Sequence, residues 1–175
     1  PETVLPAIEA ITQTFEQFAV ELRNAGADGL FFATTQWGSS NLISWGEYEK
    51  FGVPYDMRVI KAAGDDALNL LHVCSSNNYL KEIVALDYPC KMYNWDSEDP
   101  TNMPLDKGME LIPEGAIIGG ADREGWLLHA SPDEIRHKMD DITGTFDPAR
   151  LIIGPGCSIP PEVPMENLAA IREKL

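Results

Sequence analysis

Two side chains that can bind zinc stand two positions apart in one apolar segment. Residues 67–74 (Ala-Leu-Asn-Leu-Leu-His-Val-Cys) are predicted to form a strand, in which residues i and i+2 point to the same face. His72 and Cys74 would then share a face, and Cys157 ends another predicted strand. Three protein ligands and an open fourth position are typical of a catalytic zinc, which can hold a substrate thiol as a nucleophile.

The same residue types also admit a plain structural interpretation. Buried cysteine thiols often behave as small apolar side chains, and His72 could be a core histidine bonded to a carbonyl group. Spacing alone leaves both interpretations open. Cys90 lies near the start of its predicted strand, away from the predicted site, and is interpreted as a core residue.

Polar side chains at the ends of other predicted strands complete the candidate set. Asp122 could orient a substrate, act as a base or bind zinc, or it could cap the next turn. Asn94 and Asp96 are further candidate catalytic residues. Gln36, in the polar loop after the first predicted strand, and Trp95 are candidate cofactor-binding residues.

Five short apolar runs alternate with helical patterns, and these elements must position the candidates. The predicted strands are 29–34, 67–74, 88–95, 116–122 and 151–157, and the predicted helices are 4–22, 45–51, 55–63, 76–86, 106–111, 131–142 and 164–175. This order predicts an α/β fold with a parallel sheet, whose sites form at the carboxyl ends of the strands. Five strands are too few for a closed eight-stranded barrel, and an open doubly wound sheet is the alternative that the pattern leaves open.

Particular residues mark helix ends. Gly26 and Gly64 are expected to end the first helix and the 55–63 helix, and Pro54 is expected to break the helical pattern between 45 and 63. Ser76 or Asn77 is expected to cap the 76–86 helix. Residues 131–134 (Ser-Pro-Asp-Glu) form a capping box with proline at the first helical position.

Composition narrows the possible partners. The 175 residues include 13 Lys+Arg and 28 Asp+Glu, a net charge of −15, which argues against binding nucleic acid or an anionic membrane surface. The 44% hydrophobic content suffices for a core, and three cysteines do not suggest a disulfide scaffold. Without a bilayer-length apolar segment or a signal-peptide pattern, a soluble cytoplasmic protein is expected.

Several segments resemble one family. They are 71–74 (Leu-His-Val-Cys), 94–96 (Asn-Trp-Asp), 118–122 (Ile-Gly-Gly-Ala-Asp), 131–135 (Ser-Pro-Asp-Glu-Ile), 154–167 (Gly-Pro-Gly-Cys through Asn) and Gln36 with the helix that follows. Together they resemble the C-terminal half of the uroporphyrinogen decarboxylase superfamily. The resemblance implies that residues 1–175 are a single domain, a partial (β/α)8 barrel with about five parallel strands, whose first half is absent.

Within that superfamily the sequence resembles one branch more than the other. Uroporphyrinogen decarboxylases carry a Gly-His-Gly-Ile type of motif where this sequence has Cys157. The corrinoid-dependent methyltransferases, such as methylcobamide:coenzyme M methyltransferases, instead use His-x-Cys and a later Cys as zinc ligands. The resemblance therefore implies a zinc bound by His72, Cys74 and Cys157, and a corrinoid methyl donor on a partner protein.

The leading hypothesis is a zinc-dependent methyltransferase that moves a methyl group between methylcobamide and a small-molecule thiol, active as part of a full barrel. One alternative is a uroporphyrinogen decarboxylase of porphyrin biosynthesis. The other is a non-catalytic half-barrel subunit or fragment. An exposed sheet edge would make such a chain pair with the missing N-terminal half-barrel or with itself.

Overall fold

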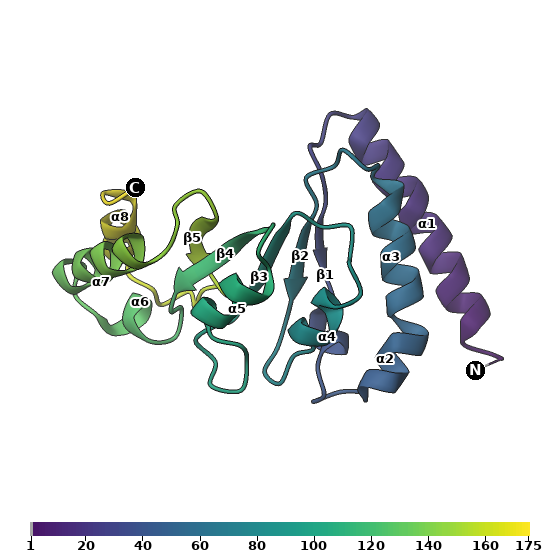
Figure 1. Cartoon of the computed structure of the whole chain (residues 1–175), viewed down its shortest axis with the longest axis horizontal. Coiled ribbons are helices and arrows are strands. Elements are labelled where there is room, and N and C mark those ends of the chain that lie inside the picture. Colours follow the sequence, from purple (N-terminus) through teal and green to yellow (C-terminus); the bar gives the residue numbers. More distant parts are fainter. Residues whose placement is uncertain (1) are drawn as a thin grey trace. The chain divides into compact units, whose positions relative to one another are not determined.

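A computed structural model describes residues 2–175 as two compact units, one reaching Tyr93 and one running from Asn94 to Leu175. The first contains α1 (Leu5–Asn24), β1 (Phe31–Ala33), the 3-10 helix η1 (Thr35–Gly38), α2 (Trp45–Phe51), α3 (Val53–Ala62), β2 (Leu70–Val73) and α4 (Leu80–Val84) (Figure 1). β3 (Met92–Trp95) carries the chain into the second, which contains α5 (Leu105–Leu111), β4 (Ala116–Ala121), α6 (Trp126–His129), α7 (Pro132–Thr145), β5 (Leu151–Pro155) and α8 (Met165–Arg172). Within the described range, no helix combines the length and apolar character that a membrane span requires.

The strands follow the chain in the order β1-β2-β3-β4-β5 within one sheet. β1 pairs with β2 in parallel, with Phe31 beside Leu70, and β4 pairs with β5 in parallel, with Ile117 beside Leu151. The expected α/β fold with five strands is confirmed. Consecutive strands become neighbours because a helical segment returns the chain between them, as in βα units.

The first unit is built by two helices packed side by side. α1 lies along α3 (Figure 1), and the pair is tied by Arg58, whose guanidinium binds the Glu9 and Glu16 carboxylates at 2.7 Å each. Fully buried side chains such as Ile60 of α3 and Leu71 of β2 form the core. The predicted helix stops are confirmed by Gly26 and Gly64, which adopt φ values of +100° and +94°.

Two local predictions in this unit are wrong. The predicted break between two helices lies at Gly52 rather than at Pro54, which stands in the first turn of α3, where its missing N–H is not needed. Neither Ser76 nor Asn77 caps α4, which begins at Leu80. Residues 76 and 77 form a turn instead, and their carbonyl groups accept hydrogen bonds from residues 39–41.

The second unit packs α7 and α8 together (Figure 1). Ile135 and Met139 of α7 and Ala170 of α8 are fully buried in one cluster. The capping box is confirmed, because the Ser131 side chain accepts from the Glu134 N–H and the Glu134 carboxylate accepts from the Ser131 N–H. α6, a single turn, has no counterpart among the predicted elements.

A half-buried carboxylate, that of Asp56, lies in the first unit and was not expected from the sequence pattern. The Tyr48 hydroxyl donates to the Asp56 carboxylate at 2.6 Å. Burial raises the pKa of that carboxyl to about 6, although the hydrogen bond from Tyr48 opposes the rise. Burial also raises the pKa of Tyr48 and Tyr88, so both hydroxyls stay protonated.

Asp56→Asn is expected to stabilise the chain above pH 6 and to leave it unchanged near pH 4. The folded state holds the Asp56 proton up to about pH 6, whereas an unfolded aspartate releases it near pH 4. Stability therefore falls as pH rises between these values, by on the order of 2–3 kcal/mol. Urea unfolding of wild type, Asp56→Asn and the exposed control Asp65→Asn at pH 4.5 and pH 8 measures this, and equal wild-type and Asp56→Asn midpoints at pH 8 contradict it.

Candidate functional site

β2 places two of the candidate ligands. His72 lies within the strand with 6% of its surface exposed, and its ring stacks on Phe31 of β1, with 5.8 Å between ring centroids. Its backbone carbonyl accepts from the Thr34 N–H at 3.0 Å. Cys74 follows the strand directly and is half-buried. The imidazole is thus held by β2 and by the neighbouring strand β1. The Cys74 thiol follows two positions further along the chain.

The loop after Cys74 is tied to the loop after β1. Ser75 and Asn77 adopt φ values of +72° and +50°, which turn the chain sharply. The Ser39 hydroxyl donates to the Ser76 carbonyl at 2.6 Å, and the Asn78 amide donates to the Val73 carbonyl at 3.3 Å. These bonds fix the backbone on the carboxyl side of Cys74. Gln36 lies exposed on η1, in the loop that follows β1.

In the second unit, Asn94 and Trp95 of β3 face inward. The Asn94 side chain is buried, and its amide donates to the carbonyl groups of Ile118 in β4 at 2.8 Å and Pro155 in β5 at 3.1 Å. The Trp95 side chain is 1% exposed, and its indole N–H donates to the Met103 carbonyl at 2.6 Å. Asn94 thereby joins three strands. Trp95 fills the core beneath α5.

Asp122 uses its carboxylate locally. The oxygens accept from the Gly125 N–H at 2.8 Å and the Trp126 N–H at 3.4 Å, so the side chain caps the turn that begins α6. A Cβ at Gly125 would overlap the Asp122 carboxylate, so a larger residue there would displace this cap. The capping role was one of the two interpretations that the sequence left open. Its proposed catalytic role stays a prediction.

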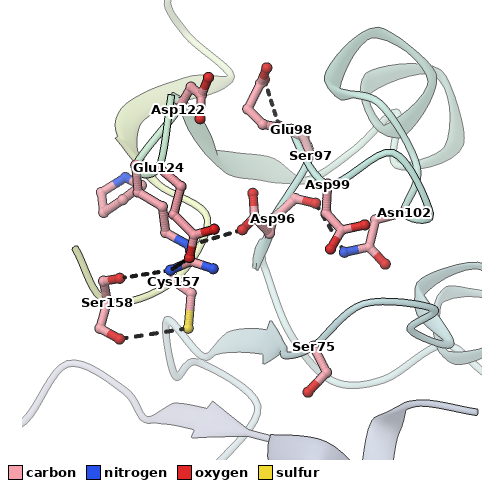
Figure 2. Close-up of polar contacts among 12 residues, drawn as sticks. Ser75, Asp96, Ser97, Glu98, Asp99, Asn102, Asp122, Glu124, Cys157 and Ser158 are labelled. Carbon is pink, nitrogen blue, oxygen red and sulfur yellow. Dashed lines mark hydrogen bonds and ion pairs between the residues drawn. The ribbon is translucent and has the colours of Figure 1, made fainter. Parts of the chain in front are cut away.

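Asp96 and Cys157 are linked through Arg123, a residue that the sequence analysis did not select. The Arg123 Nε donates to the Asp96 carboxylate at 2.9 Å, and its Nη1 donates to the Ser158 carbonyl at 3.3 Å. Figure 2 shows Asp96, Glu124, Cys157 and Ser158 as neighbours. The signal available in the sequence was a charged pair, Asp122-Arg123, directly after a predicted strand.

The strand ends of this unit are acidic. Burial and the nearby carboxylates of Asp122 and Asp96 raise the pKa of Glu98. Burial opposes the charge of Arg123, but the Asp96 carboxylate outweighs it, with help from Glu124, so the pKa of Arg123 is raised. The guanidinium therefore remains a permanent cation among several carboxylates.

Cys90 differs from the other two cysteines. Burial raises the pKa of its thiol to about 12, so the group stays protonated at neutral pH. A metal ligand must be the thiolate. Cys90 is therefore a poor ligand, in keeping with its interpretation as a core residue.

Comparison with known proteins assigns the chain to a family. The model of the uroporphyrinogen decarboxylase (URO-D) family matches residues 1–175, and the chain belongs to that family. A uroporphyrinogen decarboxylase of Syntrophotalea carbinolica is 27% identical over 173 residues, covering 97% of this chain and 47% of that protein. The methylcobamide:CoM methyltransferase MtbA of Methanosarcina acetivorans is 22% identical over 180 residues, covering 98% of this chain and 49% of that protein.

A solved structure shares the fold. A methyltransferase from Methanosarcina mazei superimposes with a TM-score of 0.73 at 22% identity, covering 93% of this chain and 46% of that one. The expected partial barrel is thereby confirmed as the fold class. The chain spans about half the length of the curated relatives it matches. The single domain over residues 1–175 and the individual site roles stay predictions, as does the joint ligand set of His72 and Cys74 with Cys157.

Proposed function

We propose that this chain supplies the zinc-binding half of a barrel that moves a methyl group between a corrinoid, methylcobamide, and a thiol acceptor. His72, Cys74 and Cys157 would be the zinc ligands. The observation that carries the proposal is the donor set: one imidazole and two thiols, each at or just beyond a strand's carboxyl end. Nitrogen and sulfur donors suit zinc, and three of them leave a position for a substrate.

The chain's own residues would prepare this ligand set. β1 and the loop bonds around residues 39–41 hold His72 and Cys74 in place. When bound, zinc would keep an acceptor thiol deprotonated at neutral pH. The acceptor sulfur would then form a bond to the methyl carbon, while the electron pair of the broken cobalt–carbon bond stays with the corrinoid of the partner protein.

Charge favours methyl transfer over porphyrinogen decarboxylation. A porphyrinogen bears several carboxylates and needs cationic partners. The strand ends of the second unit present Asp96, Glu98 and Glu124, and Arg123 is already bound to Asp96 and Glu124. These groups would repel a polycarboxylate. Because a uroporphyrinogen decarboxylase is among the relatives, decarboxylation is the second candidate function.

Two assays separate these candidates. The zinc-loaded chain, together with a complementary half-barrel, is expected to transfer the methyl group of methylcobalamin to a thiol, measured by the change in corrinoid absorbance. Uroporphyrinogen is expected to remain unchanged by product analysis. Porphyrinogen turnover without methyl transfer would overturn the proposal. The absence of both activities would also overturn it and would indicate a non-catalytic half-barrel.

The complementary half would cover an apolar groove in the first unit. A cavity of about 1320 Å³ is lined by α1, β1, α2 and α3, including Phe15, Phe18 and Phe31. Phe31 is on β1, the end strand of the sheet. Because the relatives are about twice as long, we propose that an apolar strand-and-helix segment of the same fold covers this surface. In the chain alone, a second copy would cover it.

Phe18→Ser is expected to weaken self-association of the isolated chain about tenfold or more. Phe18 is 53% exposed and lines the groove, and burying such a side chain is worth about 1.5–3 kcal/mol. The matched control is Val20→Ser, since Val20 is 42% exposed on the same helix but does not line the groove. Sedimentation velocity over a concentration series measures the effect. A folded wild-type monomer at every concentration would contradict it.

A further inference from the structure

Cys157 lies on a segment without regular secondary structure. β5 ends at Pro155 and α8 begins at Met165, so backbone hydrogen bonds of a helix or strand do not fix the thiol. A zinc ligand must nevertheless be held close to its ideal distance and direction. Something outside the segment must therefore position it.

The chain before Cys157 is pressed against the end of β3. A Cβ at Gly156 would overlap the Asp96 Cα and would lie 2.8 Å from the Trp95 carbonyl oxygen. Glycine is required for this close approach. The contact fixes the amino side of Cys157 and leaves its carboxyl side to be held by another group.

Arg123 supplies the second anchor. Its guanidinium reaches from the end of β4 to the Asp96 carboxylate and the Ser158 carbonyl, at 2.9 and 3.3 Å. The Arg123 and Asp96 side chains are only 23% and 17% exposed, so water competes weakly for the ion pair between them. Both sides of Cys157 are thus anchored on Asp96, one through Gly156 and one through Arg123.

We propose that Arg123 is a positioning residue for Cys157, holding the segment 156–158 against the end of β3 so that the thiol is ready to bind metal. The proposal rests on the proposed function, because Cys157 matters as a zinc ligand there. Asp96 then serves as the fixed partner of Arg123. A lysine cannot replace the guanidinium fully, since one ammonium group does not span both acceptors in the same fork geometry.

The test compares Arg123→Met, Arg123→Lys and a matched control in the full chain. The control is Arg136→Met, because Arg136 of α7 also binds two carboxylates, those of Asp133 and Glu173, in the same unit. Zinc affinity is measured by competition with a chromophoric chelator. Arg123→Met is expected to lose about 10- to 100-fold in affinity, the effect typical of groups that orient metal ligands, with Arg123→Lys intermediate and Arg136→Met unchanged.

A second readout separates this proposal from the proposed function. Amide hydrogen exchange at residues 156–158 in the metal-free chain is expected to be at least about tenfold faster in Arg123→Met than in wild type or Arg136→Met. Unchanged exchange overturns the positioning role. If the wild type binds no zinc, the proposed function fails, and exchange at residues 156–158 still decides whether Arg123 holds the segment. Unchanged zinc affinity in Arg123→Met, with zinc bound by wild type, also overturns the positioning role.

Discussion

Cys157→Ser is expected to lower the zinc affinity of this chain by more than about 100-fold. Removing a direct ligand should cost more than removing a group that only orients one, for which 10- to 100-fold losses are typical. The serine hydroxyl is nearly the same size but is not a ligand that zinc favours at neutral pH. Metal analysis after dialysis, followed by chelator competition, measures the loss. His72→Ala and Cys74→Ser should lower the zinc affinity in the same way.

Cys90→Ser is the matched control for that result. Burial raises the pKa of the Cys90 thiol to about 12, so this side chain does not supply a thiolate and its replacement should leave zinc affinity unchanged. Zinc affinity should also fall as the pH is lowered, because protons compete with the metal for its ligands. Equal zinc binding by wild type and Cys157→Ser would overturn the proposed ligand set.

Trp95→Ala is expected to lower the free energy of unfolding by about 3–5 kcal/mol, the range found when a buried aromatic side chain is removed. The indole is 1% exposed and donates its N–H to the Met103 carbonyl. It lies so close to Gly108 of α5 that a Cβ at that residue would overlap it. Its loss leaves both a cavity and a carbonyl without its donor. Urea unfolding followed by circular dichroism measures the change.

The control for Trp95 is Trp37→Ala. Trp37 is 55% exposed, and replacement of an exposed side chain usually changes stability by less than about 0.5 kcal/mol. The pair also tests the predicted cofactor role of Trp95. A Trp95→Ala variant as stable as wild type, but with weakened corrinoid binding, would show that the indole serves the cofactor rather than the core.

Much of the fold could be predicted because its signals are local. The apolar spacing of α1, the turn at Gly26 and the capping box at Ser131 each involve neighbouring residues, so the sequence shows them directly. The prediction of a cap at Ser76 or Asn77 was wrong for a non-local reason. The Ser76 and Asn77 carbonyls accept hydrogen bonds from residues 39–41. The turn that these bonds stabilise precedes α4, which begins only at Leu80.

The candidate site was predictable in residue type but not in the use of each side chain. His72, Cys74 and Cys157 were selected because imidazole and thiol groups at strand ends are typical zinc ligands. Arg123 was missed because its importance lies in its partners, Asp96 and Ser158, which are far away along the chain.

The sequence by itself determined the order of the five strands and of most helices, the family resemblance and the residue types available for metal binding. Apolar periodicity, helix caps and turn residues depend on amino acids a few positions apart, so they can be recognised in the sequence. Only the tertiary structure decided that Asp122 caps α6, that Asn94 joins three strands and that Asp56 accepts a hydrogen bond from Tyr48. Those outcomes depend on which distant backbone and side-chain groups meet, and that is settled when the strands pair and the helices pack.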